Sequence, residues 1–353
     1  MKIIITGGHL TPALACIDFI QKNHPNDEII FIGRKFSQEN GKLAQEENEI
    51  KRRNIKFLPL SSPKFQSHKT FNLLIQMPKL TKAIIKSKQI INWEKPEVFL
   101  SFGGYLSIPV SLAAKLTNTK IIIHEQTSEL GLANKIASLF ANKIALSQEN
   151  SKYLNNKKFI LTGNPIRESL VKKTSAPNWI ENFNKKPILY ITGGNQGSEI
   201  INKLVKQSLE KLLENFIIIH QLGNSYKTTS KKDYYARSWI EEKELAWILQ
   251  NADLALSRSG ANSVQELQYF AIPTLFIPLP TARNNEQLHN AQKIEKLGGA
   301  LILEQEQANS NALIKNLKYL LANRETMREK LQENQPKQSL NAAENIYELL
   351  KSI

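Results

Sequence analysis

The sequence holds one cysteine, Cys16, among its 353 residues. A single cysteine excludes a disulfide framework and a zinc site made of clustered cysteines, and it is typical of a chain that folds in a reducing compartment. No stretch reaches the roughly 18 uninterrupted apolar residues of a membrane span. The apolar N-terminus is broken at residues 6–9 and at Pro12, and no cleavage site follows. We therefore expect a strand, a loop and a helix there rather than a signal peptide.

Several sequence patterns are also missing. There is no internal repeat and no low-complexity tract. Neither G-x-G-x-x-G nor G-x-x-x-x-G-K-[ST] occurs, which disfavours dinucleotide oxidoreduction and P-loop hydrolysis. Aromatic residues make up only 8% of the chain, and no nucleic-acid reader motif is present. A nucleic-acid partner is therefore not expected.

Positive charge is abundant. Lys and Arg number 47 against 32 Asp and Glu, a net charge of +15, which predicts an anionic partner. Residues 51–100 contribute +9 of it, from eleven basic and two acidic residues. Apolar residues interleave with these lysines at partly helical spacing, as in Leu80 and Ile84, and predict a basic amphipathic helix. Such a helix either binds an anionic membrane surface or packs inward with a solvated lysine face.

Length and pattern predict two domains, at ~150 residues per domain. Short apolar strands alternate with helical stretches in each half, which predicts two parallel sheets covered by helices. A helical tail without a strand follows and is expected to pack back across the seam between the domains. The predicted domains are 1–164, 165–339 and a C-terminal helix over 340–353. The expected strands are 2–5, 28–32, 98–101, 120–124 and 144–146, then 187–192, 217–221, 254–257, 274–277 and 300–303.

Glycine-rich segments follow several of these strands. In parallel sheets ligands bind beyond the carboxyl ends of the strands, and backbone N–H groups at a helix start can bind phosphate. A glycine pair after one strand is more often a tight turn, so each segment by itself is weak support for a phosphate site.

Four segments in order carry more information. They are Ser101-Phe102-Gly103-Gly104-Tyr105-Leu106-Ser107-Ile108-Pro109, then His124-Glu125-Gln126-Thr127 with Gly131-Leu132-Ala133-Asn134-Lys135, then Thr162-Gly163-Asn164-Pro165-Ile166-Arg167, and finally the pair Gly193-Gly194-Asn195-Gln196-Gly197 and Ser257-Arg258-Ser259-Gly260-Ala261-Asn262-Ser263-Val264-Gln265-Glu266. From the N-terminus to about residue 305, the chain closely resembles the MurG family of glycosyltransferases, in glycosyltransferase family 28.

The resemblance implies a GT-B fold, with two Rossmann-like domains facing across a cleft. It implies inverting transfer of N-acetylglucosamine from UDP-N-acetylglucosamine to the C4 hydroxyl of N-acetylmuramic acid on undecaprenyl diphosphate, in peptidoglycan synthesis. No metal and no cofactor are implied. The enzyme is expected to be peripheral, on the cytoplasmic face of the plasma membrane.

The resemblance also implies roles for individual residues. His9 is the candidate general base, because imidazole titrates in the right range to take a proton from the acceptor hydroxyl; the alternative is that it orders the loop or binds diphosphate. Gly103, Gly104 and Tyr105 belong to the acceptor and diphosphate loops. Contacts to the UDP-sugar are predicted for Thr6, Gly7, Gly8, Thr127, Arg167, Asn195, Ala261, Asn262, Ser263, Glu266 and Gln287.

Two of these side chains suit their implied partners chemically. The carboxylate of Glu266 can accept two hydrogen bonds from the ribose diol, although an acid near a helix start can also serve only the helix dipole. The guanidinium of Arg167 suits phosphate oxygens, although it could be a surface residue without a role. The segment that contacts uracil is expected near residues 239–245.

The chain departs from the family pattern at several positions. Its first loop is compressed to Ile5-Thr6-Gly7-Gly8-His9, Thr127 and Asn195 replace an Asn and a Ser, and Glu286 stands where His or Gln is usual. An inverting GT-B enzyme with a different acceptor is therefore the second hypothesis. A non-catalytic binder of nucleotide sugars and a nucleic-acid binder are the others.

Overall fold

The structure, a computed structural model, describes residues 1–34, 45–63, 71–127, 129–149, 153, 156–181, 186–194, 197–223, 226, 228–282 and 285–353; side chains are not described at 45 and 71–75. The chain forms two compact units. Unit 1 comprises Met1–Arg167 and Gln338–Ile353, and unit 2 comprises Glu168–Lys337. The chain thus passes between the units twice, whereas the predicted boundaries followed residues 164 and 339.

Unit 1 contains one parallel sheet of seven strands in the order β3-β2-β1-β4-β5-β6-β7. Helices connect most of its successive strands, as is usual in the βαβ units of a parallel sheet. The elements are β1 (Lys2–Thr6), α1 (Leu10–Asn23), β2 (Glu28–Gly33), α2 (Gln45–Arg52), β3 (Lys56–Pro59), α3 (Phe71–Glu94), β4 (Val98–Ser101), α4 (Ser107–Leu116), β5 (Lys120–Glu125), α5 (Leu132–Ala137), β6 (Lys143–Leu146), β7 (Phe159–Leu161) and, after unit 2, α14 (Gln338–Lys351).

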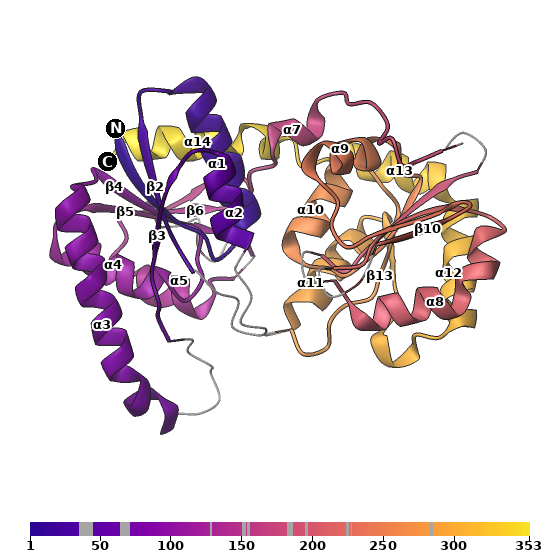
Figure 1. The fold of residues 1–353 in the computed structure, drawn as a ribbon, viewed down its shortest axis with the longest axis horizontal. Helices are drawn as coiled ribbons and strands as arrows, with labels where there is room; N and C mark the ends of the chain where they lie inside the picture. The colour runs from indigo at the N-terminus through magenta and orange to yellow at the C-terminus, as the bar shows by residue number, and fades with distance from the viewer. Residues whose placement is uncertain are drawn as a thin grey trace. The chain divides into compact units, whose positions relative to one another are not determined.

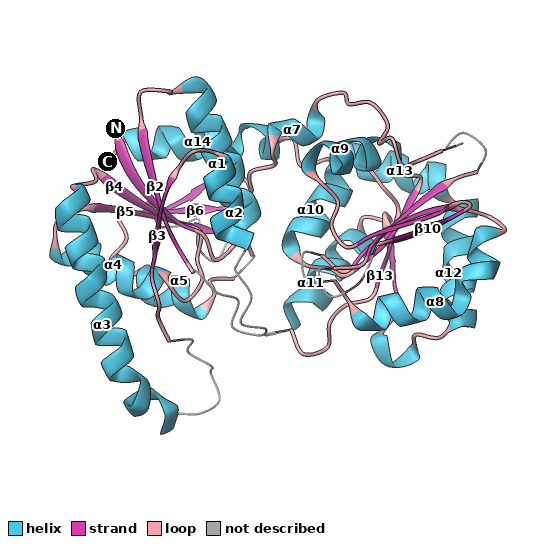
Figure 2. Cartoon of the chain, in the orientation of Figure 1, coloured by secondary structure: helices cyan, strands magenta, loops and turns pink. Residues whose placement is uncertain are grey.

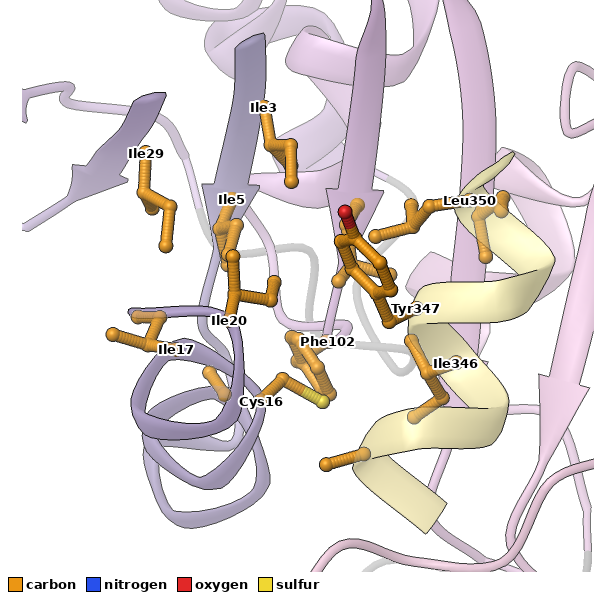
Figure 3. Packing of buried hydrophobic residues seen from close by; sticks show 14 of the residues in the cluster. Ile3, Ile5, Cys16, Ile17, Ile20, Ile29, Phe102, Ile346, Tyr347 and Leu350 are labelled. Carbon is orange, nitrogen blue, oxygen red and sulfur yellow. The ribbon is translucent and has the colours of Figure 1, made fainter. Parts of the chain in front are cut away.

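Helices cover both faces of this sheet because alternate strand residues point to opposite sides. Ile3 and Ile5 of β1 pack with α1, α2 and α14, whereas Ile4 packs with α3, α4 and α5. In Figure 1, α1, α2 and α14 accordingly lie on one side of the sheet and α3, α4 and α5 on the other. Figure 3 shows side chains of α1 and α14, such as Ile17 and Ile346, beside the strands. The C-terminal helix, predicted to pack across a seam, therefore completes the core of unit 1.

Unit 2 repeats the design with the strand order β10-β11-β9-β8-β12-β13-β14, in which only β10 is antiparallel. Helices α8 and α12 lie on one side of the sheet, and α9, α10 and α11 lie on the other (Figure 2). The elements are α7 (Glu168–Val171), β8 (Ile188–Thr192), α8 (Glu199–Leu213), β9 (Ile217–Gln221), β10 (Thr229–Lys231), β11 (Tyr234–Arg237), α9 (Glu242–Asn251), β12 (Leu254–Ser257), α10 (Ala261–Tyr269), β13 (Thr274–Phe276), α11 (Glu286–Lys296), β14 (Ala300–Ile302), the 3₁₀ helix η2 (Gln305–Gln307), α12 (Ser310–Ala322) and α13 (Arg324–Glu333).

The prediction of two doubly wound parallel sheets is confirmed, and each of the ten expected strands is present within a residue or so at its ends. Four strands were not predicted: β3, β7, β10 and β11. Within the described ranges, no helix has both the length and the apolar character needed to cross a membrane.

Candidate functional site

The strand order of each unit creates one position where the connections diverge to opposite sides of the sheet. In unit 1 it lies between β1 and β4, and in unit 2 between β8 and β12. The loops beyond the carboxyl ends of the strands at such a switch point form the natural ligand crevice of a doubly wound sheet. The glycine-rich segments after β1, β4, β8 and β12 therefore lie at the two switch points.

In unit 1 the loops after β1 and β4 touch through glycine backbones. A Cβ placed on Gly8 would lie 2.4 Å from the Cα of Gly104, and one on Gly104 would lie 2.6 Å from the Cα of Gly8. The N–H of His9 donates to the carbonyl of Phe102 at 3.1 Å. Gly104 also has a φ of +77°, where glycine is favoured. The two loops are therefore fixed against each other at the first turn of α1.

A buried chain of hydroxyls supports these loops. Thr6 Oγ1 donates to Ser101 Oγ at 3.3 Å, and Ser101 Oγ donates to Ser107 Oγ at 2.7 Å. The N–H of Gly103 donates to Ser101 Oγ at 3.2 Å. The side chain of Thr6, a predicted UDP-sugar contact, is thus fully buried at the foot of the loop.

His9 is the residue at the N-cap of α1, and its half-buried ring makes no capping hydrogen bond. Burial lowers the pKa of His9, and the negative charge of Glu125 partly opposes that effect. A neutral imidazole can accept a proton, and a nearby carboxylate stabilises the imidazolium that results. The lowered pKa therefore favours the neutral form of the His9 ring, the form that can accept a proton.

Glu125, at the end of β5, organises the next loop. Its Oε1 accepts from the N–H and the hydroxyl of Thr127 at 3.0 and 2.8 Å, and its Oε2 accepts from the Gly131 N–H and Asn134 Nδ2, both at 2.9 Å. Thr127 Oγ1 also lies 2.7 Å from the Glu129 carbonyl. The hydroxyl of Thr127, predicted to contact the UDP-sugar, thus has partners within its own loop.

His124 lies beneath this loop and is almost fully buried. Its Nε2 is 3.2 Å from the Gly163 carbonyl and 3.0 Å from Ser147 Oγ, and that hydroxyl donates to the Glu125 carbonyl. A carbonyl can only accept, so Nε2 carries the proton. Burial lowers the pKa of His124 to about 4. His124 is therefore neutral. Through Gly163, it connects residues 124–126 to the stretch of chain that leads from unit 1 to unit 2.

Two further predicted residues of unit 1 lie at its surface. Tyr105 is half-buried; burial raises the pKa of its hydroxyl, and a hydrogen bond with Arg34 opposes that shift. Arg167 is half-buried at the last position before unit 2. Both side chains have partners within the chain.

In unit 2 the switch point presents two helix N-termini. Helix α8 begins after Ser198, whose Oγ accepts from the Ile201 N–H at 3.4 Å, and α10 begins after Gly260, which has no side chain to cap it. A Cβ on Gly194 or Gly260 would meet no heavy atom of the described chain within 4 Å. N-termini of helices attract anions through their free N–H groups and the helix dipole. The starts of α8 and α10 are therefore the candidate anion-binding position of unit 2.

The predicted UDP-sugar contacts of unit 2 surround this opening in part. Ala261, Asn262 and Ser263 form the first turn of α10, and Glu266 follows on the same helix, all half-buried. Gln287, in the first turn of α11, accepts the Leu279 N–H at Oε1 at 3.0 Å. Asn195 lies outside the described residues.

Sequence reasoning missed the roles of two polar side chains in the segments that it singled out. His124 and Arg258 both come at the ends of buried strands, and both are buried themselves. The available signal was their position: a polar residue that directly follows an apolar strand run lies at the loop edge of the sheet. Only the strand order shows what each one contacts.

Two successive doubly wound sheets, each with glycine-rich switch-point loops, define the GT-B class of fold. Residues 3–146 match the glycosyltransferase family 28 N-terminal domain, and residues 188–350 match the glycosyltransferase family 28 C-terminal domain. The chain belongs to glycosyltransferase family 28.

Relatives and solved structures agree with this assignment. A protein of Clostridium tetani (strain Massachusetts / E88) is 34% identical over 99% of this chain and 97% of its own length, and one of Clostridium novyi (strain NT) is 36% identical over 88% of each. Both are named UDP-N-acetylglucosamine–N-acetylmuramyl-(pentapeptide) pyrophosphoryl-undecaprenol N-acetylglucosamine transferase.

Among solved structures, Acinetobacter baumannii MurG has a TM-score of 0.70 at 23% identity, covering 100% of this chain and 99% of that one. A putative UDP-N-acetylglucosamine 2-epimerase from Listeria monocytogenes reaches 0.68 at 16% identity, covering 99% and 96%. A MurG protein and a protein described as an epimerase thus share this architecture. At these identities the likeness establishes the fold alone.

Proposed function

We propose that this chain transfers N-acetylglucosamine from UDP-N-acetylglucosamine to the C4 hydroxyl of N-acetylmuramyl-(pentapeptide) pyrophosphoryl-undecaprenol. The observation that carries the proposal is the full-length similarity to relatives named for this transfer, at 34% identity over 99% of the chain. The loops at the two switch points, one with a base and one with an anion-binding opening, supply the chemical groups that the reaction needs.

In the proposed reaction, the acceptor hydroxyl oxygen attacks the anomeric carbon C1 of the donor sugar. The bond between C1 and the β-phosphate oxygen breaks, UDP leaves with the electron pair, and the configuration at C1 inverts. His9 takes the hydroxyl proton. Burial, which lowers the pKa of His9, keeps the ring neutral before the reaction, and the charge of Glu125 stabilises the protonated ring afterwards.

The donor is proposed to bind mainly to unit 2. Its diphosphate would approach the N-termini of α8 and α10, where Gly194 and Gly260 leave open space. Glu266 would accept hydrogen bonds from the ribose diol. Because Gln287 Oε1 already accepts the Leu279 N–H, its Nε2 is the end that would donate to a sugar oxygen. Arg167 and Asn195 are further proposed diphosphate contacts.

The acceptor carries a lipid, and unit 1 has a surface suited to an anionic membrane. Four cations of the basic block, Lys51, Arg52, Arg53 and Lys56, pair with acids of unit 1. On α3, by contrast, four lysines are exposed, and none pairs with an acid among the described residues. They are Lys79, Lys82, Lys86 and Lys88. Among the described residues, the unpaired charge of the block therefore gathers on α3 and at Lys95, directly after it.

Large apolar side chains are exposed on the same helix, on α4, which packs against it, and just after α5, which packs against α4. Ile85 and Trp93 of α3 are 53% and 85% exposed. Leu116, at the end of α4, and Leu139, just after α5, are 58% and 76% exposed. Lysines around protruding apolar and aromatic side chains are typical of proteins that bind the surface of an anionic bilayer. We propose that this face holds the enzyme at the membrane that contains its acceptor.

The proposal is tested by incubating the protein with radiolabelled UDP-N-acetylglucosamine and the lipid-linked muramyl-pentapeptide. The wild-type protein should transfer label to the lipid. His9→Ala should reduce kcat by roughly 10²–10⁴-fold, the usual contribution of a general base, and should leave UDP binding unchanged in calorimetry.

Two results would contradict this assignment. Absence of transfer by folded wild-type protein that binds UDP would point to a different acceptor or to a non-catalytic binder. Normal turnover by His9→Ala would remove His9 as the base and leave it as a residue that orders the loop.

A further inference from the structure

Arg258 is a buried cation at the switch point of unit 2. It directly follows β12, and its side chain is 8% exposed. Nε donates to Ser198 Oγ at 3.1 Å, Nη1 donates to the carbonyls of Ile277 and Pro278 at 2.8 and 3.0 Å, and Nη2 donates to Gln305 Oε1 at 2.7 Å. All four acceptors are uncharged groups.

The positive charge itself therefore has no counter-ion in the part of the chain that the structure describes. Burial lowers the pKa of Arg258, with no carboxylate nearby to oppose that shift. Arginine still keeps its proton, because its ordinary pKa is so high. A buried charge without an opposite charge is expensive. The four hydrogen bonds explain why the fold needs donors at this position, but uncharged acceptors do not require that the donor carry a positive charge.

The hydrogen bonds of Arg258 join the loops that carry the proposed donor contacts. Ser198 is the N-cap of α8. Pro278 precedes Leu279, whose N–H binds Gln287. Arg258 itself stands two residues before Gly260, the N-cap of α10. One guanidinium thus fixes the segments that follow β8, β12 and β13, and it places a full positive charge against Ser198, the N-cap of α8.

We propose that Arg258 is a positioning and specificity-determining residue of the donor site, whose buried charge is balanced by the diphosphate of the nucleotide when the donor binds. The inference rests on the proposed function, because it takes the nucleoside diphosphate to lie at this switch point. Arg258 acts through the loops and through its electric field, without touching the ligand. The site should therefore bind uridine weakly and gain affinity with each phosphate.

The decisive variant is Gln305→Glu. It puts a carboxylate against Nη2, keeps the guanidinium and its other hydrogen bonds, and cancels the charge. Because a buried ion pair replaces an uncompensated cation, the variant should melt at the same temperature as wild type or higher. Calorimetry with uridine, UMP and UDP should show UDP affinity reduced about tenfold or more, since charges in a partly buried site interact over several ångströms. Uridine affinity should not change.

Gln307→Glu is the matched control, because it makes the same change of net charge in the same short helix at an exposed position. It should keep the wild-type ratio of UDP to uridine affinity. Arg258→Lys retains the charge without the planar fork, so it should keep that ratio but lower kcat. Arg258→Gln removes the charge and should lower the ratio of UDP affinity to uridine affinity.

An unchanged UDP-to-uridine ratio in Gln305→Glu, or an equal loss of uridine and UDP binding, would overturn the inference and leave Arg258 as a structural tie. Should Arg258→Gln fail to fold, Gln305→Glu still decides. The transfer assay is independent of this result. A wild-type protein with the predicted charge dependence but no transfer would support the role of Arg258 and contradict the proposed reaction.

Discussion

Glycines in close backbone contact occur at both switch points, at Gly8 and Gly104 in unit 1 and at Gly193 and Gly197 in unit 2, but Gly260 of unit 2 meets open space. In unit 1, Gly8 and Gly104 face each other so closely that either Cβ would lie within 2.6 Å of the other residue's Cα. In unit 2, Gly260 has an ordinary φ of −64° and no described neighbour within 4 Å of its Cβ position. The fold requires glycine in the first case and does not in the second. The loop of unit 1 is a closed support for His9, whereas unit 2 leaves open space for a ligand.

The largest expected effect comes from substituting these glycines. Gly8→Ala forces a methyl group into backbone and should destabilise unit 1 by about 3 kcal/mol, the upper range for overpacking. Gly260→Ala meets open space, so its cost in stability should stay below about 1 kcal/mol. Its UDP affinity should nevertheless fall about tenfold, because a blocked hydrogen bond to a charged group is worth roughly 1.5–3 kcal/mol.

Urea unfolding and UDP calorimetry on both variants measure this contrast. Gly104→Ala is a second variant on the unit 1 side and should behave as Gly8→Ala does. If Gly260→Ala bound UDP as wild type does, the opening at α10 would have no part in binding and the contrast between the units would fail.

The sequence predicts the sheets well because their central strands are short apolar runs, such as residues 254–257. Three of the four strands that it misses lack that signal, and the fourth, β7, is an apolar run of only three residues. β3 (Lys56–Pro59) and β7 (Phe159–Leu161) lie at sheet edges and are half-exposed, and β10 (Thr229–Lys231) is fully exposed. β11 (Tyr234–Arg237) is buried, but its tyrosines and arginine do not form an aliphatic run. Edge strands bury little, so little in their sequence identifies them.

The glycine-rich loops were also predictable, but their geometry was not. Whether Gly8 meets backbone or Gly260 meets solvent depends on which strand lies beside β1 or β8, and strand order is a tertiary property. Arg258 shows the same limit. In the sequence it stands in a polar segment, where arginine is usually exposed. Its burial arises only when the loops after β8, β12 and β13 converge.

The next prediction concerns a feature that the two units share, a buried neutral histidine. His220 of β9 donates from Nε2 to Asn202 Oδ1 at 3.0 Å and accepts the Tyr234 hydroxyl at Nδ1 at 3.2 Å. Burial lowers the pKa of His220 to about 3 and that of His124 to about 4. In the folded state each histidine therefore stays neutral at pH values below 6.5, its ordinary pKa, where the same histidine in the unfolded chain would be protonated.

Because both folded pKa values are depressed, the stability that each histidine contributes is complete above pH 6.5 and is lost as the pH falls. The loss should end near pH 4 for His124 and near pH 3 for His220. Within that window each should cost about 1.4 kcal/mol of unfolding free energy per pH unit. His124→Gln and His220→Gln should each remove one such slope in urea unfolding at pH 6, 5 and 4.5.

The exposed His289 supplies the control, since His289→Gln should leave the pH dependence unchanged. If one of the buried variants kept the wild-type slope, the histidine that it replaced would already be protonated or solvated in the folded state. The two units would then differ where the structure makes them alike.

The smallest expected effect is a difference in membrane binding between the surfaces of the two units. Replacing one exposed lysine of α3, as in Lys86→Gln, should weaken binding to vesicles that contain anionic lipid by about 1 kcal/mol, or roughly fivefold. Lys206→Gln on α8 of unit 2 removes the same charge from an equally exposed helix and should change binding far less. Sedimentation with vesicles measures both.

Added salt should reduce the difference, because screening weakens attraction between exposed charges. Equal losses from α3 and α8 would mean that binding follows net charge alone, and the membrane face proposed for unit 1 would then have to be abandoned.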